Sequence, residues 1–225
     1  MATKKVAIDG PAGAGKSTIA KHLAKTLGYI YVDTGAMYRS VALYCIEKNV
    51  APSCEEKVNL LLDDIDIDIR YENGSQQIYL CGRNVSDLIR TPEVSMGASD
   101  VSKHSLVRSK LVSLQRAIAE KNNVIMDGRD IATKVMPDAD VAIFLTADVN
   151  DRAKRRYDEL VLKSPSLTFE EVLEDMKRRD ENDSTRANSP LKMAENAVLV
   201  DTTGNTLEQS IETISGIIEN VMRSK

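Results

Sequence analysis

The chain has 225 residues, of which 42% are hydrophobic and 28% are charged, and its formal net charge is −4. This balance is typical of a globular protein with one substantial core and argues against a disordered chain. The acidic balance gives no global basic field, so we expect no nucleic-acid partner. The longest apolar stretches are strand-sized and the N-terminal residues lack a signal-peptide pattern, so we expect no membrane association.

The three cysteines, Cys45, Cys54 and Cys81, are an odd number and show no C-x-x-C spacing. They are typical of reduced residues rather than of a disulfide or zinc framework. The cysteine pattern therefore predicts a cytoplasmic protein.

A phosphate-binding loop follows the first predicted strand, residues 5–9. Gly10, Gly15, Lys16 and Ser17 match the pattern G-x-x-x-x-G-K-[ST]. The glycines let backbone N–H groups point into one concave nest, and the helix predicted from Lys16 adds the positive end of its dipole. Lys16 can reach the β- and γ-phosphates, and the Ser17 hydroxyl can ligate Mg²⁺. The loop therefore predicts a nucleoside triphosphate site.

Strand and helix alternate along most of the chain, which predicts a parallel sheet flanked by helices. The predicted strands are residues 5–9, 29–32, 123–127, 141–145 and 197–201. The predicted helices of the core include residues 16–27, ending before Gly28, residues 36–48, and a last helix from about Thr206, with Thr206 and Gln209 in capping-box positions. Right-handed crossovers bring the carboxyl ends of such strands to one edge, where we expect the functional side chains.

Residues 65–81 depart from this alternation. Isoleucine and aspartate alternate over residues 65–69, Asn73 and Gly74 form a hairpin signal, and residues 77–81 return, with a third short strand expected near Val85. The pattern predicts a small antiparallel lobe, which either is a plain surface hairpin or flanks a second substrate. Residues 90–122 then read as helical, with Pro92 near a helix start.

Arginines and carboxylates gather after other predicted strands. They occur in residues 33–39, in residues 127–130, at Arg152, Arg155 and Arg156 on one predicted helix, and at Arg178, Arg179, Asp183 and Arg186 on a later segment. Phosphoryl transfer needs positive charge on the moving phosphate, and arginine forks grip phosphates bidentately. The guanine-binding motif N-K-x-D of GTPases is absent, so the pattern favours a small-molecule kinase.

Five segments of the chain together resemble the bacterial cytidylate kinase family of nucleoside monophosphate kinases. These segments are residues 8–18, 33–39, 90–94, 127–130 and 178–186. The first is shared by many kinases, but the combination is specific and covers essentially the whole chain. The resemblance implies an α/β P-loop NTPase fold, with a five-stranded parallel sheet flanked by helices, a small antiparallel β insertion and a helical lid. It implies a single domain with a core at 1–62, 88–149 and 191–225, an NMP-binding insertion at about 63–87, and a lid at about 150–190.

The same resemblance implies transfer of the γ-phosphoryl group of ATP to CMP or dCMP in pyrimidine nucleotide metabolism, giving CDP or dCDP plus ADP. It implies Mg²⁺ as cofactor, held by Ser17, and a monomeric enzyme. The implied ATP-binding residues are Gly10, Pro11, Ala12, Gly13, Ala14, Gly15, Lys16, Ser17 and Thr18. The implied catalytic residues are Lys16, Arg129, Arg152 and Arg156.

The resemblance also divides the acceptor site by the part of the nucleotide that each residue contacts. Thr34, Ser99, Arg108 and Asp130 surround the cytosine, and Thr34 keeps a hydroxyl where serine is common. Asp183 faces the sugar, and Arg39, Arg129 and Arg186 bind the acceptor phosphate. Arg152, Arg155, Arg156 and Arg179 lie in or near the lid and face the reacting phosphates, and Arg179 is also counted among the CMP-binding residues.

Two alternatives remain at this point. The enzyme could phosphorylate UMP equally well, or another small alcohol or monophosphate. The chain could instead be an ATP-binding module whose hydrolysis drives a partner, but the sequence shows neither a large apolar patch signal nor a basic stripe for such a partner.

Overall fold

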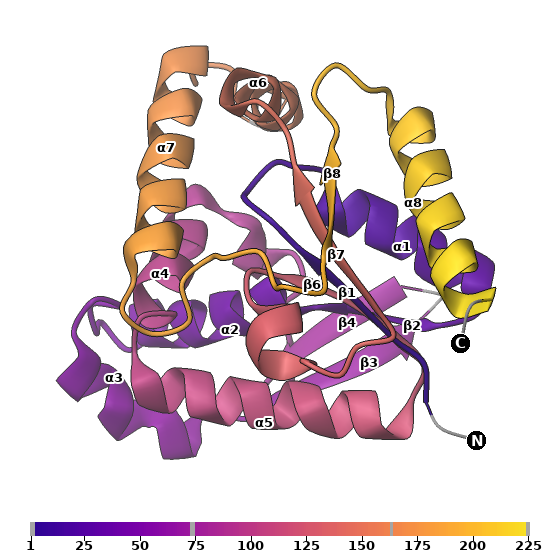
Figure 1. Cartoon of the computed structure of the whole chain (residues 1–225). Coiled ribbons are helices and arrows are strands. Elements are labelled where there is room, and N and C mark those ends of the chain that lie inside the picture. The colour runs from indigo at the N-terminus through magenta and orange to yellow at the C-terminus, as the bar shows by residue number, and fades with distance from the viewer. Residues whose placement is uncertain (1–2, 73–74, 163, 224–225) are drawn as a thin grey trace. The chain divides into compact units, whose positions relative to one another are not determined.

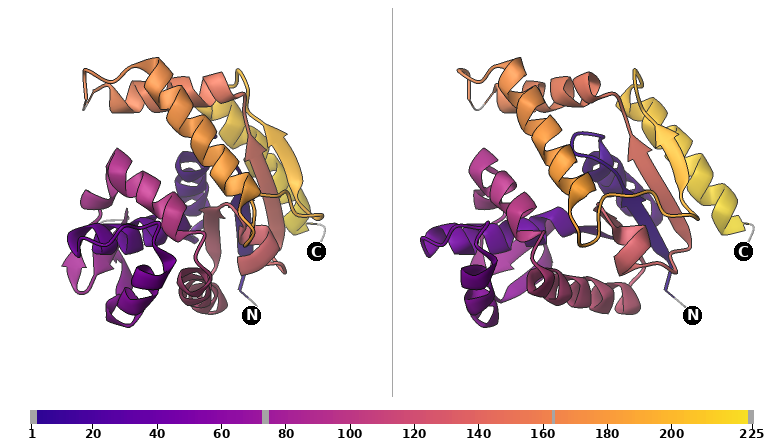
Figure 2. Two further views of the ribbon diagram at one scale, coloured as in Figure 1. Left: turned by 90° about the vertical axis from the view of Figure 1, so that its left-hand side faces the viewer. Right: turned by 60° about the vertical axis from the view of Figure 1, so that its left-hand side comes forward.

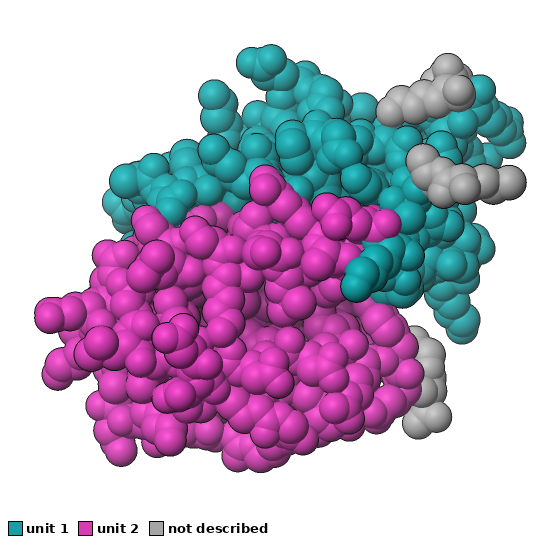
Figure 3. Space-filling view, turned by 90° about the horizontal axis from the view of Figure 1, so that it is seen from below, with its two compact units in different colours: residues 1–31, 121–225 teal, residues 32–120 magenta. Residues whose placement is uncertain are grey.

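The computed structural model describes residues 3–72, 75–162 and 164–223. Within it the chain forms two compact units, which are coloured separately in Figure 3. Unit 1 comprises residues 1–31 and 121–225, and unit 2 comprises residues 32–120. No helix in the described part of the chain is long and apolar enough to cross a membrane.

A five-stranded sheet organises unit 1 (Figure 1). Its strands, in the order β2-β6-β1-β7-β8, are β2 (Ile30–Asp33), β6 (Val124–Gly128), β1 (Lys5–Asp9), β7 (Val141–Thr146) and β8 (Val198–Asp201), and β2 runs on into unit 2. β1 pairs in parallel with β6 and β7, and β7 pairs in parallel with β8. The predicted parallel sheet is therefore confirmed, and no strand begins or ends more than one residue from its predicted bounds. β1 and β6 are nearly all buried, as their continuous apolar runs predict.

Helices flank this sheet. They are α1 (Lys16–Leu27), α6 (Val149–Leu160), α7 (Phe169–Thr185), α8 (Leu207–Arg223) and a short π-helix, η3 (Ile131–Val135). α1 and α8 pack against each other, and they contact β6 and β7, respectively (Figure 1). α1 ends at Gly28 in a left-handed conformation (φ 67°), as predicted. The predicted capping box at α8 is also present, because Thr206 N–H donates to Gln209 Oε1 (2.9 Å) and Gln209 N–H donates to Thr206 Oγ1 (3.2 Å).

α6 and α7 pack side by side in unit 1 (Figure 2). Ala153 of α6 and Val172 and Met176 of α7 form a small buried cluster between them. Tyr157 and Phe169 meet edge to face, with ring centroids 6.2 Å apart. These helices carry the arginines that the sequence groups together, so their packing decides where those arginines point.

Unit 2 is built from helices and a three-stranded antiparallel sheet. Its elements are α2 (Thr34–Glu47), α3 (Glu55–Leu61), η1 (Leu62–Asp64), β3 (Ile67–Glu72), β4 (Ser75–Leu80), β5 (Arg83–Asn84), η2 (Leu88–Arg90), α4 (Pro92–Val101) and α5 (Ser105–Lys121). β3 and β4 form the predicted hairpin, with β5 as the third short strand next to Val85. Ile65 and Ile67 are buried while Asp66 and Asp68 are exposed. The alternation therefore indicates a strand with one face on the core and one face in solvent. The predicted turn at 73–74 lies outside the described residues.

The helical expectation for residues 90–122 is met by two helices, α4 and α5, with a break between them. At this break the Ser102 hydroxyl donates to the carbonyl oxygen of Ser99 (2.8 Å), and His104 Nε2 lies 2.8 Å from the carbonyl oxygen of Pro52. Side chains that bond to nearby backbone groups compete with helix continuation. α2 packs along α4, and buried residues such as Met37, Val41 and Val101 fill the core of unit 2.

Candidate active site

The loop between β1 and α1 holds its glycines in conformations that other residues rarely adopt. φ is 148° at Gly10 and 72° at Gly13. A Cβ atom at Gly10 would overlap the carbonyl oxygen of Leu145, and one at Gly13 would lie 2.9 Å from the carbonyl oxygen of Arg152. Because only glycine fits both positions, the loop can run directly against β7 and α6. Its curled backbone has the form of an anion-binding nest.

Lys16 is the first residue of α1, directly after this loop, and is 5% exposed. Its Nζ donates to the carbonyl oxygen of Pro11 at 2.6 Å. Burial lowers the pKa of Lys16 to about 7, and the nearby Arg129 guanidinium works in the same direction. The Asp127 and Asp9 carboxylates oppose this shift. The Lys16 amine therefore lies beside the loop and is only partly protonated near pH 7. A phosphate bound in the loop would favour its charged form.

Asp127 near the end of β6 connects the phosphate loop to β2. The Ser17 hydroxyl donates to Asp127 Oδ2 at 2.7 Å, and the Tyr31 hydroxyl donates to Asp127 Oδ1 at 2.8 Å. Both carboxylate oxygens thus have a donor that fixes the orientation of the group. The hydroxyl of Ser17 and the carboxylate of Asp127 are both hard oxygen ligands.

Two arginines and two aspartates gather at the carboxyl end of β6 and the end of α7. Arg129 Nε donates to Asp183 Oδ2 at 2.8 Å. The Arg186 guanidinium lies 3.8 Å from Asp130 Oδ1 and 3.9 Å from Asp183 Oδ1, and its Nε donates to the carbonyl oxygen of Ser189 at 2.6 Å. Asp130, Asp183 and Arg186 are all buried. The structure thus brings four predicted acceptor residues into one cluster.

The ionisation of this cluster is set by mutual pairing. Burial alone would raise the pKa of Asp183, but Arg129 and Arg179 hold it below its usual range. Burial likewise disfavours the charge of Arg129, but Asp183, with smaller contributions from Asp180 and Asp127, raises the pKa of Arg129 above its usual value. Both groups therefore stay charged at neutral pH, and the guanidinium groups can receive an anion.

Arg152 of α6 contacts the phosphate loop directly. It is 6% exposed, and its guanidinium donates to the carbonyl oxygens of Ala12 (3.0 Å) and Ala147 (2.9 Å). It also pairs with Asp180 of α7 at 2.6 Å. The predicted catalytic position of Arg152 is thus next to the loop, with its fork held by loop and α7 together.

The other two arginines of α6 point elsewhere. Arg155 donates to the carbonyl oxygen of Thr202 at 2.8 Å, just after β8. Arg156 pairs with Glu159 of its own helix at 3.1 Å, and the Glu159 side chain is mostly exposed. The contacts of Arg156 therefore do not join it to the phosphate loop, and its catalytic role stays a prediction.

In unit 2, Thr34 and Arg39 lie at the start of α2. Asp33 caps this helix by accepting the N–H of Ala36 at 2.8 Å, and it pairs with Arg39 at 2.8 Å. Thr34 is 3% exposed. The cap fixes the first turn of α2 and holds the Arg39 fork in one orientation.

Ser99 and Arg108 lie near the break between α4 and α5. Both are buried, and no partner for Ser99 Oγ exists within the described parts of the chain. Arg108 donates to the carbonyl oxygen of Ser102 at 3.3 Å, and its guanidinium lies 5.6 Å from the centroid of the Tyr38 ring. A buried hydroxyl without a partner is costly, so Ser99 Oγ has hydrogen-bonding capacity for a ligand.

A family model described as cytidylate kinase matches residues 6–220. The chain belongs to the cytidylate kinase family. It is 46% identical over 220 residues to the cytidylate kinase of Caldicellulosiruptor bescii, covering 98% of this chain and 97% of the relative. It is 49% identical over 217 residues to that of Caldicellulosiruptor saccharolyticus, covering 96% of both chains. As a cytidylate kinase family member, the chain is a phosphotransferase.

The fold of this cytidylate kinase family member also occurs in a solved structure of an uncharacterized protein from Eubacterium ventriosum. The TM-score is 0.53 at 14% identity, and the match covers 97% of this chain and 99% of that chain. This likeness concerns the fold alone.

Several contributors to the site are absent from the residues predicted to bind or react. Asp33 and Asp127 stand at strand ends inside recognised segments, so their position was a usable signal. Tyr31, Tyr38 and Asp180 give no such signal, because each acts through a partner on another element. In this member of the cytidylate kinase family, Tyr38 contacts Arg108 and Asp180 pairs with Arg152, two residues that the sequence does identify, whereas Tyr31 bonds Asp127.

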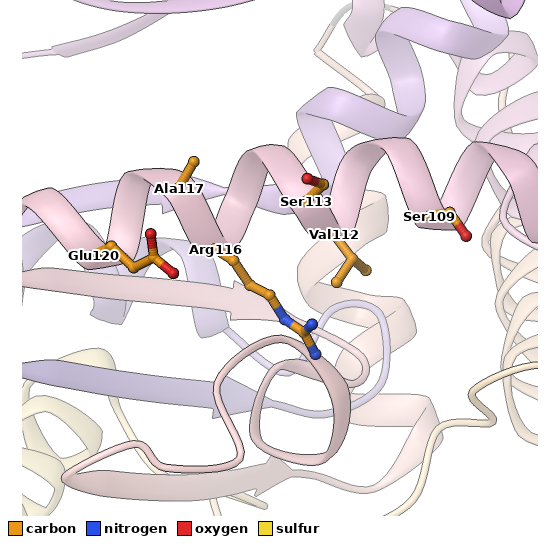
Figure 4. A pocket seen from close by; sticks show the side chains of 6 residues that line it. All are labelled: Ser109, Val112, Ser113, Arg116, Ala117 and Glu120. Carbon is orange, nitrogen blue, oxygen red and sulfur yellow. The ribbon is translucent and has the colours of Figure 1, made fainter.

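A cavity of about 460 Å³ lies along α5 (Figure 4). It is lined by Ser109, Val112, Ser113, Arg116, Ala117 and Glu120. None of the six is a predicted site residue of the cytidylate kinase family. All six belong to one face of this helix.

Proposed function

We propose that this enzyme transfers the γ-phosphoryl group of ATP to CMP or dCMP, giving ADP and CDP or dCDP. The observation that carries the proposal is the presence of two anion-binding arrangements after neighbouring strands. The phosphate loop follows β1, and the cluster around Arg129 and Arg186 follows β6, whose Gly128 pairs with Asp9 of β1. One triphosphate would occupy the first arrangement, and the second supports a separate phosphate-bearing acceptor.

For ATP, we propose binding by the loop residues Gly10, Pro11, Ala12, Gly13, Ala14, Gly15, Lys16, Ser17 and Thr18. Lys16 stabilises charge on the transferring phosphoryl group, and Arg152 acts beside it because it already contacts the loop. Arg129 and Arg156 complete the proposed catalytic set. Phosphoryl transfer needs no covalent nucleophile from the protein, so these groups act through position and charge.

The residues around Ser17 fit a divalent cation. Its hydroxyl lies 2.7 Å from the Asp127 carboxylate, and both groups offer oxygen ligands of the kind that Mg²⁺ prefers. Among residues 3–72, 75–162 and 164–223, no group of three or more His, Cys, Asp or Glu side chains forms a metal-binding cluster. Few protein ligands suit Mg²⁺, which keeps water and phosphate oxygens in its shell. When bound, the ion neutralises charge on the phosphate oxygens.

For the acceptor, we propose that Arg39, Arg129 and Arg186 bind the phosphate of CMP. Asp183 faces the sugar, and Arg179 is counted with the CMP-binding residues while facing the reacting phosphates. Thr34, Ser99, Arg108 and Asp130 contact the base. The polarity of these groups supports cytosine, because the Asp130 carboxylate can accept from N4 and the Arg108 guanidinium can donate to N3 and O2.

We propose further that residues of about 150–190 act as a lid and residues of about 63–87 as an NMP-binding insertion. The core of this single domain would then be 1–62, 88–149 and 191–225. The acidic net charge supports an enzyme that binds no nucleic acid. We place it as a monomer in the cytoplasm, without membrane association, in pyrimidine nucleotide metabolism.

A coupled assay of ADP formation against a panel of nucleoside monophosphates tests the proposal. We expect rapid turnover with CMP and dCMP, slow turnover with UMP, and little ADP without an acceptor. Equal use of UMP would refute the specificity. ADP formation that needs no monophosphate at all would favour an ATPase that drives a partner.

A further inference from the structure

Asp9 is the last residue of β1 and precedes the phosphate loop, yet its carboxylate does not bond to that loop. Asp9 Oδ1 accepts the backbone N–H of Ile131 at 2.8 Å, and Oδ2 accepts the N–H of Ala132 at 2.8 Å. Both donors belong to the first turn of η3, where backbone N–H groups lack partners within the helix. Asp9 is 2% exposed, so bulk solvent does not reach this arrangement.

The two residues between β6 and η3 are Arg129 and Asp130. β6 ends at Gly128, which is paired in register with Asp9. η3 begins at Ile131, whose N–H the Asp9 carboxylate accepts. One residue of β1 therefore holds both ends of this two-residue connection, by the strand ladder on one side and by its carboxylate on the other.

The buried position of Asp9 disfavours the ionised form of its carboxylate. Burial raises the pKa of Asp9 to about 6, although the two backbone N–H donors oppose that shift, and the neighbouring Asp130 carboxylate raises it further. Lys16 offsets part of this cost. A side chain that only filled space would avoid the cost, whereas a group with two acceptor oxygens satisfies two adjacent N–H donors at once.

We propose that Asp9 is a positioning residue for the acceptor nucleotide: by holding both ends of the connection between β6 and η3, it sets the orientation of Arg129 and Asp130. The inference rests on the proposed roles of these two residues toward CMP. Arg129 in turn bonds Asp183, and Asp130 lies beside Arg186, so the whole cluster depends on this connection. Asp9 thereby links the strand that leads into the ATP loop to the residues that read the acceptor.

Asp9→Asn tests the proposal, because it keeps the size of the side chain. The amide can accept only one of the two N–H groups and turns its own NH₂ toward the other. We expect kcat/KM for CMP to fall by about tenfold to a hundredfold, as for a misplaced reacting group. The KM for ATP should change by less than about twofold, and the preference for CMP over UMP should shrink. A merely structural role would leave that preference unchanged.

Ile8→Val is the matched control. Ile8 precedes Asp9 on β1, is fully buried, and loses one methylene in the variant. Its melting temperature should drop while the CMP-to-UMP preference stays as in the wild type. An equal loss of preference in Ile8→Val would overturn the proposal, as would an Asp9→Asn enzyme with unchanged CMP kinetics or an equal defect toward ATP.

Asp9→Ser, assayed at a temperature where circular dichroism shows it folded, replaces Asp9→Asn if the latter does not fold. A serine hydroxyl is too short to reach both N–H groups, so the same loss of CMP preference is expected, and its absence would overturn the proposal. The wild-type enzyme is measured alongside. A wild type that does not use CMP would refute the proposed function, whereas a wild type that uses CMP beside an unaffected variant would refute only the role of Asp9.

Discussion

The Tyr31 hydroxyl donates to Asp127 Oδ1 at 2.8 Å, in a buried contact between β2 and β6. The other oxygen of Asp127 accepts from Ser17 at the start of α1. Tyr31 therefore orients the Asp127 carboxylate, which bonds to Ser17, the proposed Mg²⁺ ligand. Tyr31 itself lies outside the phosphate-binding motif of the sequence.

Tyr31→Phe should lower the free energy of unfolding by about 1–3 kcal/mol, because it leaves a buried carboxylate oxygen without its donor. The Mg²⁺ concentration needed for half-maximal activity should rise at the same time. Urea denaturation and Mg²⁺ titration of the rate measure the two effects. Tyr29→Phe is the control, since Tyr29 is only partly buried against the same core. Equal effects of both substitutions would contradict the role given to the Tyr31 hydroxyl.

Lys16→Met should lower kcat by at least about a hundredfold, because the ammonium interacts most strongly with charge that grows in the transition state. Binding of CMP should change little, since the proposed acceptor contacts do not include Lys16. Steady-state kinetics and calorimetric titration with CMP measure these quantities. Lys25→Met, at an exposed position in the last turn of α1, is the control. Near-normal turnover of Lys16→Met would contradict the proposed role of Lys16 in stabilising the transferring phosphoryl group.

ATP binding should take up protons between about pH 7 and 9. The pKa of Lys16 is lowered to about 7 by burial, with Arg129 adding to the effect, so the empty enzyme carries much of this group in neutral form above pH 7. The triphosphate favours the charged ammonium and raises its pKa, so a proton enters on binding. Calorimetry in buffers of different ionisation enthalpy measures the uptake. The uptake should approach one proton per ATP near pH 8 and vanish in Lys16→Met.

The sequence predicted the five strands of the sheet, the phosphate loop, the end of α1 at Gly28 and the capping box of α8. Each of these depends on spacing within one segment, such as apolar runs or the interval from Thr206 to Gln209. The π-helix η3 was not predicted, because its first turn is held by Asp9, more than a hundred residues away. For the same reason the sequence grouped Arg152, Arg155 and Arg156 together, whereas the structure pairs them with α7, the segment after β8, and their own helix, respectively. Contacts between residues on different elements produce no periodic pattern in the sequence, so the sequence alone does not predict them.

Residues 150–190 should become more protected from hydrogen exchange when a bisubstrate analogue binds. Arg152 is held by Asp180 and by the carbonyl oxygen of Ala12, so it must exchange these partners for phosphate oxygens if the segment closes as a lid. Closure would exclude water and limit ATP hydrolysis. Exchange followed by mass spectrometry should show the change in α6 and α7, with little change in α8 as an internal reference. Equal exchange in α6 and α7 with and without the analogue would rule out the lid.

The choice of base should follow hydrogen-bond polarity at Asp130 and Arg108. Cytosine offers a donor at N4 and acceptors at N3 and O2, whereas uracil offers an acceptor at O4 and a donor at N3. A carboxylate only accepts and a guanidinium only donates, so Asp130 suits N4, and Arg108 suits N3 and O2. Opposite uracil, Asp130 would face the lone pairs of O4. Because both side chains are buried, this mismatch should cost roughly a hundredfold in kcat/KM.

Asp130→Ala should therefore reduce kcat/KM for CMP much more than for UMP and narrow the gap between the two substrates. Asp138→Ala is the control, because Asp138 lies exposed before β7 and its ion pair with Lys5 contacts none of the proposed base-binding groups. The measurement is kcat/KM for CMP, dCMP and UMP in the wild type and both variants. A wild type that takes UMP as readily as CMP, or an Asp130→Ala enzyme that loses both equally, would show that Asp130 does not read the base. Retention of the full CMP preference in Asp130→Ala would assign the discrimination to Arg108, because its donors alone would then reject the N3 proton of uracil.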